Sequence, residues 1–428
     1  MGDRPAVALW DHTVSLAETA DGKENARIPP VSLAGFDPLG GADVVGLGEA
    51  THGSREFVRL KHRLLQHLVE NRGFRTVAFE ADVAAMAAVD DAVRRERGDV
   101  AGTLSNLKWS FRTEELRVVL GWLRSFNQGR PRTDRVRVRG IDPIDTAALA
   151  HRLGSSVAAV EPGYARTSDA VLTLTNCEIP ADQTAREQAL DRVSAAAGRV
   201  ADWLEERSGG VVEDGSIPAV DELRRRCRVL EESCAFQRVR HRHDGPHPAG
   251  MEARDRYMAE TVRRALAGDR GEGVAVWAHN GHVQRGTFDD GQIWTDCTTM
   301  GERLDRTIGD RYVPIGFDFG RGAFRAIPAG SGRGEPETFT VGAPNEASAT
   351  AQLDAMSHSP CLVDLTRAAS DSRLDGWLAT HREIRQVGSV FDPDADPSTH
   401  SLQTVLPVSF DGLCFVSRST PTRPIRDR

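Results

Sequence analysis

Apolar residues along the chain fall into short runs that end in a polar, glycine-containing turn and are followed by helical periodicity. The first run is residues 44–48, and after Ser54 the apolar positions recur at spacings of three and four through Leu68. This pattern predicts a buried strand, a tight turn and a helix for which Ser54 is a suitable N-cap. Residues 76–80, a strand that ends in an acid, and the segment rich in alanine and valine through about residue 97 repeat the pattern. Two such units in series predict a parallel sheet.

Later segments extend the predicted sheet. Residues 135–142 alternate apolar and basic positions before an acid, which indicates a strand with one less buried face, and Thr113 is placed to cap the helix before it. Residues 312–320 and 324–327 predict two strands around a glycine-rich turn. Other predicted features are an apolar strand at residues 274–278, short strands at 361–365 and 413–416, and a loop over 388–407.

Between about residues 145 and 268 the strand pattern gives way to charged helical periodicity, most clearly over residues 181–207 and 217–240. We expect a helical insertion that caps the active edge of the sheet and shapes a pocket without doing chemistry itself. The predicted fold is therefore α/β, with a central mostly parallel sheet flanked by helices. Residues 1–144 and 269–428 form the two parts of its core, and residues 145–268 form the large helical insertion.

Composition narrows the classes of function. The 428 residues carry a formal charge of −8, which argues against a nucleic-acid partner, and no apolar run approaches the length of a membrane span. The N-terminus has no long apolar segment after its basic residue, so we expect no secretory signal and a cytoplasmic location. The six cysteines include no C-x-x-C pair, which predicts free thiols and disfavours a cysteine zinc site.

Acids and imidazoles follow three of the predicted strands. Glu49 and His52 follow the first strand, Glu80 ends the second, and His279 and His282 follow the apolar run that ends at residue 278. Because the carboxyl ends of parallel strands open into one crevice, we expect these five side chains to converge there. A solvated, capped turn is the plainer interpretation of the first pair, but two further groups at equivalent places favour a functional site.

Other polar residues have less specific patterns. Residues 241–247 contain three histidines and one acid and have the composition of a metal tract, but the Gly-Pro pair within them favours a loop. Lys61 lies on the apolar face of its helix, so it either extends its amine to solvent or pairs with a buried carboxylate such as Glu80. Trp109 precedes a helix near the predicted cleft, although tryptophan is more often part of a core.

The chain contains no G-x-S-x-G elbow, which disfavours a serine acyl-enzyme. An ester can instead be cleaved by water when a base removes a proton and a donor holds the developing oxyanion. His52 is the predicted base, with Glu49 or Glu80 orienting its imidazole. The predicted donor to the carbonyl oxygen is His279 or His282, with Arg55 as a candidate support, and spacing does not distinguish the two histidines.

Several motifs in order along the chain carry a family resemblance. They are residues 48–57 (Gly-Glu-Ala-Thr-His-Gly-Ser-Arg-Glu-Phe) with Lys61 and Arg63-Leu64, then Phe79-Glu80, Trp109 with Thr113-Glu114, Arg254-Asp255 with Met258-Ala259-Glu260, residues 277–283 (Trp-Ala-His-Asn-Gly-His-Val) and residues 410–415 (Phe-Asp-Gly-Leu-Cys-Phe). Together they resemble the erythromycin esterase family. The resemblance implies an α/β fold with a helical insertion, an active cleft above the sheet, and metal-independent hydrolysis of an ester such as a macrolide lactone.

Carried over by motif, the resemblance implies that the catalytic residues are Glu49, His52, Glu80, His279 and His282. The candidate substrate-binding residues are Arg55, Lys61, Trp109 and Asn280, and no cofactor is implied. The expected partner is a small-molecule ester or lactone, and three hypotheses follow for the function of the protein. The first is an esterase or lactonase, the second a natural-product biosynthesis enzyme that uses the same cleft for acyl transfer, elimination or cyclisation, and the third a protein that binds a metal or haem.

Overall fold

Ten strands of the described residues form one sheet in the order β1-β10-β14-β8-β2-β5-β3-β4, with β9 and β12 also paired to β8. The computed structural model describes residues 5–16, 33, 35–95, 100–208, 217–243, 246–268, 272–289, 294–331, 334–356 and 359–425. The sheet strands are β1 Thr13–Ser15, β2 Val44–Leu47, β3 Thr76–Asp82, β4 Arg137–Asp142, β5 Val274–Trp277, β8 Tyr312–Pro328, β9 Glu337–Val341, β10 Cys361–Asp364, β12 Val390–Phe391 and β14 Gly412–Ser419. Neighbouring strands from β14 to β4 run parallel, whereas β1, β9 and β10 pair antiparallel. The predicted mostly parallel sheet is confirmed.

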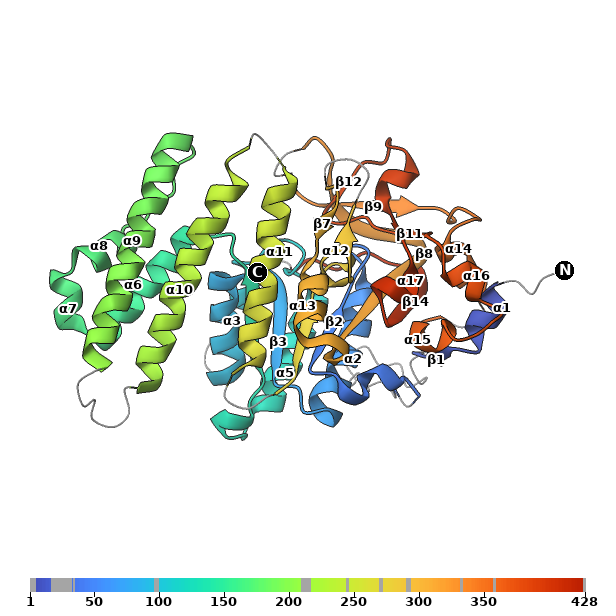
Figure 1. Cartoon of the computed structure of the whole chain (residues 1–428), viewed down its shortest axis with the longest axis horizontal. Helices are drawn as coiled ribbons and strands as arrows, with labels where there is room; N and C mark the ends of the chain where they lie inside the picture. Colours follow the sequence, from blue (N-terminus) through green and yellow to red (C-terminus); the bar gives the residue numbers. More distant parts are fainter. Residues whose placement is uncertain are drawn as a thin grey trace.

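Helices cover both faces of this sheet (Figure 1). They are α1 Pro5–Trp10, α2 Arg55–Asn71, α3 Val83–Arg95, α4 Val100–Leu104, α5 Glu114–Asn127, α6 Thr146–Val160, α7 Pro162–Thr167, α8 Asp169–Thr175, α9 Gln183–Ser208, α10 Ile217–Arg240, α11 Pro248–Leu266, α12 Asn280–Val283, α13 Met300–Ile308, α14 Ala349–Asp354, α15 Leu365–Ala368, α16 Asp375–Leu378 and α17 Leu406–Ser409. Within the described ranges, no helix is both long and apolar enough to cross a membrane.

Alternate residues of the central strands point to opposite faces, as strand geometry requires. Val45 and Leu47 of β2 join the core that α2 and α5 cover, whereas Val44 joins the core that α11 and α13 cover. Because both faces are covered, β2 is buried along its whole length and has the continuous apolar sequence of a parallel core strand.

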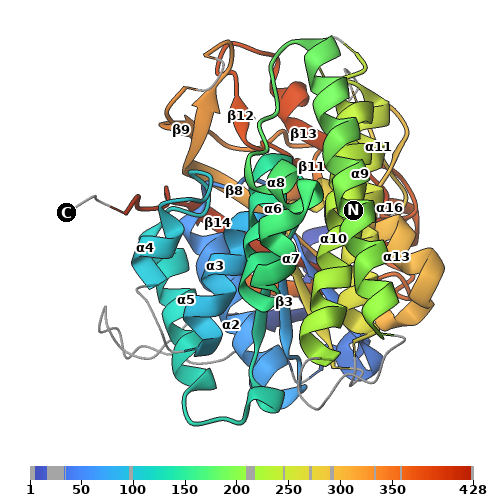
Figure 2. The same ribbon diagram turned by 90° about the vertical axis from the view of Figure 1, so that its left-hand side faces the viewer.

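Helices α6 to α10 form a lobe beside the β4 end of the sheet (Figures 1 and 2). The lobe has its own apolar core, which includes Leu153 of α6, Val200 of α9 and Leu230 of α10. It is joined to the sheet at the end of β4, where Ser233 donates a hydrogen bond to the carbonyl of Pro143. Helix α11 differs from the rest of the insertion, because its Met258 and Val262 pack in the core on the sheet itself.

Some local predictions were wrong. Residues 312–320 and 324–327 belong to the single strand β8 and are not two strands around a turn. Gly322, at φ +118°, bends this strand at the point where β9 joins as a new partner. The predicted loop over 388–407 contains β12 and β13 (Ser401–Thr404), the latter paired to β11 (Arg382–Arg385). A second small pair joins β6 (Thr287–Phe288) to β7 (Cys297–Thr298).

The two predicted N-caps behave differently. Thr113 accepts a hydrogen bond from the amide of Leu116, as expected. Ser54 occupies the N-cap position of α2, but its side chain makes no cap hydrogen bond. Its hydroxyl instead lies 2.9 Å from that of Ser419 on β14. A tertiary partner has replaced the local one, since both groups are buried at the same junction.

Candidate active site

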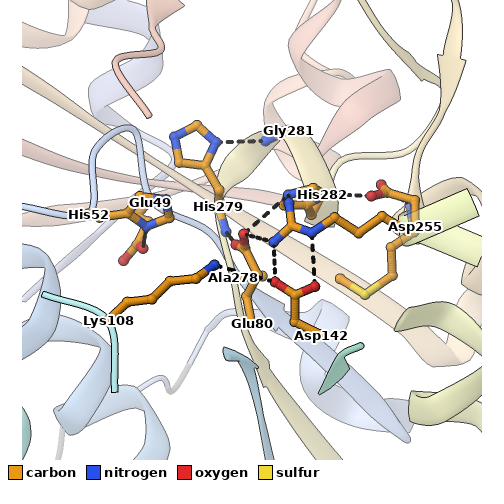
Figure 3. A network of polar contacts seen from close by, with 12 residues as sticks. Glu49, His52, Glu80, Lys108, Asp142, Asp255, Ala278, His279, Gly281 and His282 are labelled. Atoms are coloured by element: carbon orange, nitrogen blue, oxygen red, sulfur yellow. Dashed lines mark hydrogen bonds and ion pairs between the residues drawn. The ribbon is translucent and has the colours of Figure 1, made fainter. Parts of the chain in front are cut away.

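The carboxyl ends of β2, β5, β3 and β4 carry a continuous cluster of polar side chains (Figure 3). The cluster contains Glu49 and His52 after β2, Glu80 in β3, and His279 and His282 after β5. The structure thus brings the five predicted catalytic residues to one edge of the sheet. Glu49 and Glu80 do not follow adjacent strands, because β5 pairs between β2 and β3 and places His279 between them.

Glu49 and His52 form a hydrogen-bonded pair within one turn. Nδ1 of His52 lies 2.6 Å from Oε1 of Glu49, and Nζ of Lys61 lies 2.7 Å from Oε2. Burial by itself would raise the pKa of Glu49, but the charge of Lys61 and the contact with His52 outweigh it and hold this pKa below its ordinary value. Glu49 is therefore a carboxylate, and it accepts the Nδ1 proton of His52. The other ring nitrogen of His52 is left as the basic one.

Lys61 is fully buried, on the apolar face of α2. Its ammonium donates to Glu49 and to the carbonyl of Ala278, and it lies 4.8 Å from the centre of the Trp277 ring. The sequence left open whether this amine is solvated or paired, and the structure pairs it with Glu49 rather than with Glu80. Both acceptors of this ammonium belong to the protein, and its contact with substrate stays a prediction. Lys61 fits a supporting role, because it keeps Glu49 ionised.

His279 is a buried neutral imidazole next to His52, with their ring centres 5.2 Å apart. Its backbone amide donates to Oε2 of Glu80, and its Nδ1 lies 3.0 Å from Nε2 of Gln386. Burial, together with the nearby His52, lowers the pKa of His279 to about 3. Nε2 of this ring is buried and has no hydrogen-bond partner among the described residues. A buried polar atom without a partner is costly, and at this edge of the sheet it is suited to a ligand.

His282 lies between two carboxylates. Nδ1 is 2.7 Å from Asp255 of α11, and Nε2 is 3.3 Å from Glu80. Burial would lower the pKa of His282, and the charge of Arg254 acts in the same direction, but Asp255 and Glu80 outweigh both and raise this pKa to about 9. Both ring nitrogens of His282 therefore have partners within the protein, because Nδ1 faces Asp255, and Nε2 faces both Glu80 and the guanidinium of Arg254.

The raised pKa of His282 predicts a loss of stability in alkali. The stability that the folded state gains from a protonated His282 is present in full below the ordinary histidine pKa of 6.5. It is lost as the pH rises through about 9. We expect the free energy of unfolding to fall by up to about 3 kcal/mol more in the wild type than in His282→Gln between these limits. Urea unfolding of both proteins at several pH values measures the difference. Parallel pH profiles of the two proteins would contradict the assignment.

Arg254 of α11 joins Glu80 to Asp142, the acid at the end of β4. Its Nη2 lies 2.7 Å from Oε1 of Glu80 and 2.7 Å from Oδ2 of Asp142, and its Nε lies 3.1 Å from Oδ1 of Asp142. Its Nη1 lies 2.9 Å from Nε2 of His282. Burial would raise the pKa values of both carboxyls. The charges of His282 and Arg254 outweigh it at Glu80, whose pKa lies well below its ordinary value, and those of Arg254 and Lys108 outweigh it at Asp142, whose pKa is also lowered.

The predicted site lacked Arg254, Asp255 and Asp142. The insertion was expected to shape the pocket without doing chemistry, yet its last helix, α11, brings two charged residues into the cluster. Signals for these residues were present. Asp142 ends a predicted strand in the same way as Glu80, and Arg254-Asp255 belongs to a motif of the family resemblance.

The remaining predicted substrate contacts differ in their surroundings. Asn280 is fully buried and uses both ends of its amide on the backbone of Phe317, so it fits a structural role and not the predicted one. Nε of Arg55 lies 3.5 Å from Oε1 of Glu115, which ties this side chain to α5. Trp109 is half-buried with the guanidinium of Arg325 5.8 Å from its ring centre, and its contact with substrate stays a prediction.

Metal ligation was one hypothesis for the cluster. In the described part of the chain, no group of three or more histidine, cysteine or acidic residues has the geometry to hold a metal ion. Lys61 and Arg254 already occupy the carboxylates here, so the donor set does not fit a cation. In the 241–247 tract, His247 accepts from the amide of Ala249 at the start of α11 and stacks on His243, while residues 244–245 lie outside the described residues. All six cysteines are buried free thiols, as predicted.

The sequence model of the erythromycin esterase family matches residues 69–419 of the chain, a range that includes Glu80, Asp142, Arg254, His279 and His282. An erythromycin esterase type II from Escherichia coli is 29% identical over 311 residues, which cover 66% of this chain and 71% of that protein.

Solved structures share the fold over nearly the whole chain. A protein from Bacillus cereus is 21% identical with a TM-score of 0.80, covering 99% of this chain and 98% of that one. A succinoglycan biosynthesis protein is 19% identical with a TM-score of 0.78, covering 98% of each chain. A mutant of the erythromycin esterase EreC in its open conformation is 17% identical with a TM-score of 0.68, covering 93% of this chain and 97% of that one. With the family match spanning most of its length, the chain belongs to the erythromycin esterase family.

Proposed function

We propose that the protein hydrolyses a carboxylic ester or lactone of a small molecule with a water molecule activated by His52. Membership of the erythromycin esterase family supports a hydrolase role. The observation that carries the mechanism is the Lys61-Glu49-His52 chain, in which a buried ammonium holds a carboxylate and the carboxylate holds an imidazole at 2.6 Å. This arrangement has the base and orienting acid of a catalytic triad, with water in place of the serine.

The proposed reaction begins with proton transfer from water to Nε2 of His52. The hydroxide oxygen forms a bond to the ester carbonyl carbon, and the carbonyl electron pair moves to oxygen to give a tetrahedral oxyanion. Glu49 stabilises the imidazolium that results. When the carbon–oxygen bond to the leaving group breaks, its electrons stay on that oxygen, which takes the proton back from His52. The products are a carboxylic acid and an alcohol, joined in one molecule if the substrate is a lactone.

His279 is the better of the two predicted oxyanion donors. Both ring nitrogens of His282 already face carboxylates, whereas Nε2 of His279 has no partner in the described structure. A neutral imidazole that donates this proton stabilises a developing oxyanion without first losing a bond inside the protein. His282, Glu80 and Arg254 then have supporting roles. Glu80 binds the backbone amide of His279, and Arg254 and His282 keep Glu80 ionised.

Hydrolysis in heavy-oxygen water tests the proposal, with macrolides, simple esters and thioesters as the substrate panel. Macrolides belong in the panel because the similar Escherichia coli protein is an erythromycin esterase. We expect one labelled oxygen in the carboxylic acid product, since the attacking water supplies that atom. Mass spectrometry of the product measures it. Turnover without label would contradict hydrolysis and indicate acyl transfer, elimination or cyclisation through the same cleft.

A further inference from the structure

Gln386 lies next to His279, in the connection between β11 and β12. Its side chain is largely buried, with the residue 9% exposed, and its Nε2 is 3.0 Å from Nδ1 of His279. No sequence pattern singled this residue out, because it lies at the edge of the segment expected to be a loop. It is separated from His279 by more than one hundred residues along the chain.

The backbone around Gln386 is fixed from two sides. The amide of Arg385 donates to Oδ1 of Asp318 on β8, and the amide of Gln386 donates to the carbonyl of His400. The next amide, that of Val387, donates to the carbonyl of Ala50 at 2.7 Å. Ala50 is the residue after Glu49, so this connection is held against the turn that carries the proposed base. Gln386 is therefore placed accurately relative to both His52 and His279.

Two donors meet at Nδ1 of His279. The backbone amide of Gly281 points at it from 3.4 Å, and a backbone N–H can only donate. Nδ1 must therefore carry its lone pair, which places the proton of the neutral ring on Nε2. The same argument orients the carboxamide of Gln386 with its nitrogen towards the ring. The longer contact, from the amide of Gly281, identifies the tautomer with its proton on Nε2. The shorter contact, from the side chain of Gln386, stabilises that tautomer further.

We propose that Gln386 is a positioning residue that holds His279 in the tautomer with its proton on Nε2, the nitrogen that the protein leaves unpartnered. This inference rests on the proposed function, because that proton is the one proposed to stabilise the oxyanion. Gln386 acts only through His279. If His279 took the other tautomer, the ring would present a lone pair to the developing negative charge, and repulsion would replace stabilisation.

Isosteric substitutions separate positioning from packing. Gln386→Glu keeps the shape but offers the ring a carboxylate, which can only accept, so Nδ1 is expected to become protonated. Gln386→Met keeps most of the volume and removes the donor, leaving Gly281 alone to select the tautomer. Gln403→Glu is the matched control, because Gln403 is exposed on the neighbouring strand β13 and the change adds the same charge.

Nitrogen NMR of protein labelled at histidine reads the tautomer directly, with the signals of His279 identified by their loss in His279→Asn. We expect a proton on Nε2 of His279 in the wild type and in Gln403→Glu, and protonation at Nδ1 in Gln386→Glu. An unchanged His279 tautomer in Gln386→Glu, or a wild type with its proton on Nδ1, would overturn the inference. These NMR measurements require no substrate, so their result is independent of whether the protein proves to be an esterase.

Kinetics on the ester that is cleaved in labelled water give the second readout. We expect kcat to fall about 10²-fold in Gln386→Glu, the usual effect of losing one oxyanion donor, with KM nearly unchanged. Gln386→Met is expected to lose about tenfold or less, and Gln403→Glu to match the wild type. Equal losses in Gln386→Met and Gln386→Glu would indicate packing and contradict positioning. A shifted tautomer in a protein that cleaves no ester would refute the proposed function and leave the role of Gln386 in place.

Discussion

Replacement of His52 by alanine is expected to lower the rate of ester hydrolysis by about 10³- to 10⁴-fold, because it removes the group that takes the proton from water. The change should have little effect on the fold. The side chain of His52 is 13% exposed and makes its close polar contact with Glu49, which keeps Lys61 as a partner. We therefore expect a loss of no more than about 1 to 2 kcal/mol in the free energy of unfolding.

Steady-state kinetics and urea unfolding of the same preparations measure both quantities. His151→Ala is the matched control, since His151 is an exposed histidine on α6 in the helical lobe, where it bonds the carbonyl of Cys177. The control should retain wild-type turnover. If His52→Ala folded normally and still hydrolysed the substrate at a rate close to that of the wild type, His52 would not be the base.

Lys61→Met is expected to destabilise the protein by about 3 to 5 kcal/mol, the usual cost of removing one partner of a buried ion pair. Methionine fills most of the space, so the loss comes mainly from charge. Glu49 is left buried with only His52 as a partner, and burial then raises the pKa of Glu49 towards protonation. A protonated Glu49 holds His52 less well, so turnover should fall as well.

The double variant Lys61→Met, Glu49→Gln shows whether charge or packing causes the loss of stability in Lys61→Met. With both charges removed, we expect most of the lost stability to return, because no buried charge remains without a partner. Turnover should stay low, since a glutamine does not stabilise the imidazolium of His52. Urea unfolding of the wild type, both single variants and the double variant gives the coupling energy. A double variant as unstable as Lys61→Met would show that packing and not charge determines the loss.

The backbone architecture and the location of the site followed from local patterns. Apolar runs such as residues 44–48, each followed by helical periodicity, are sufficient to predict parallel strands buried on both faces. Parallel strands end at the same edge of a sheet, so acids and imidazoles placed just after them, such as Glu49 and His279, were expected together. Periodicity failed at β8, since a glycine bend inside a paired strand has the same local sequence signal as a turn.

Only the tertiary structure decided which side chains pair. The order of strands places β5 between β2 and β3, so Lys61 binds Glu49, and Arg254 binds Glu80. Gln386 comes from a segment without a motif, and the motif that contains Arg254 does not indicate which carboxylate this residue binds. Local sequence determines which residues end a strand or face a core. Contacts between distant segments depend on how the strands are ordered and the helices packed, and these contacts set the charge of Glu49, the proton of His279 and therefore the proposed chemistry.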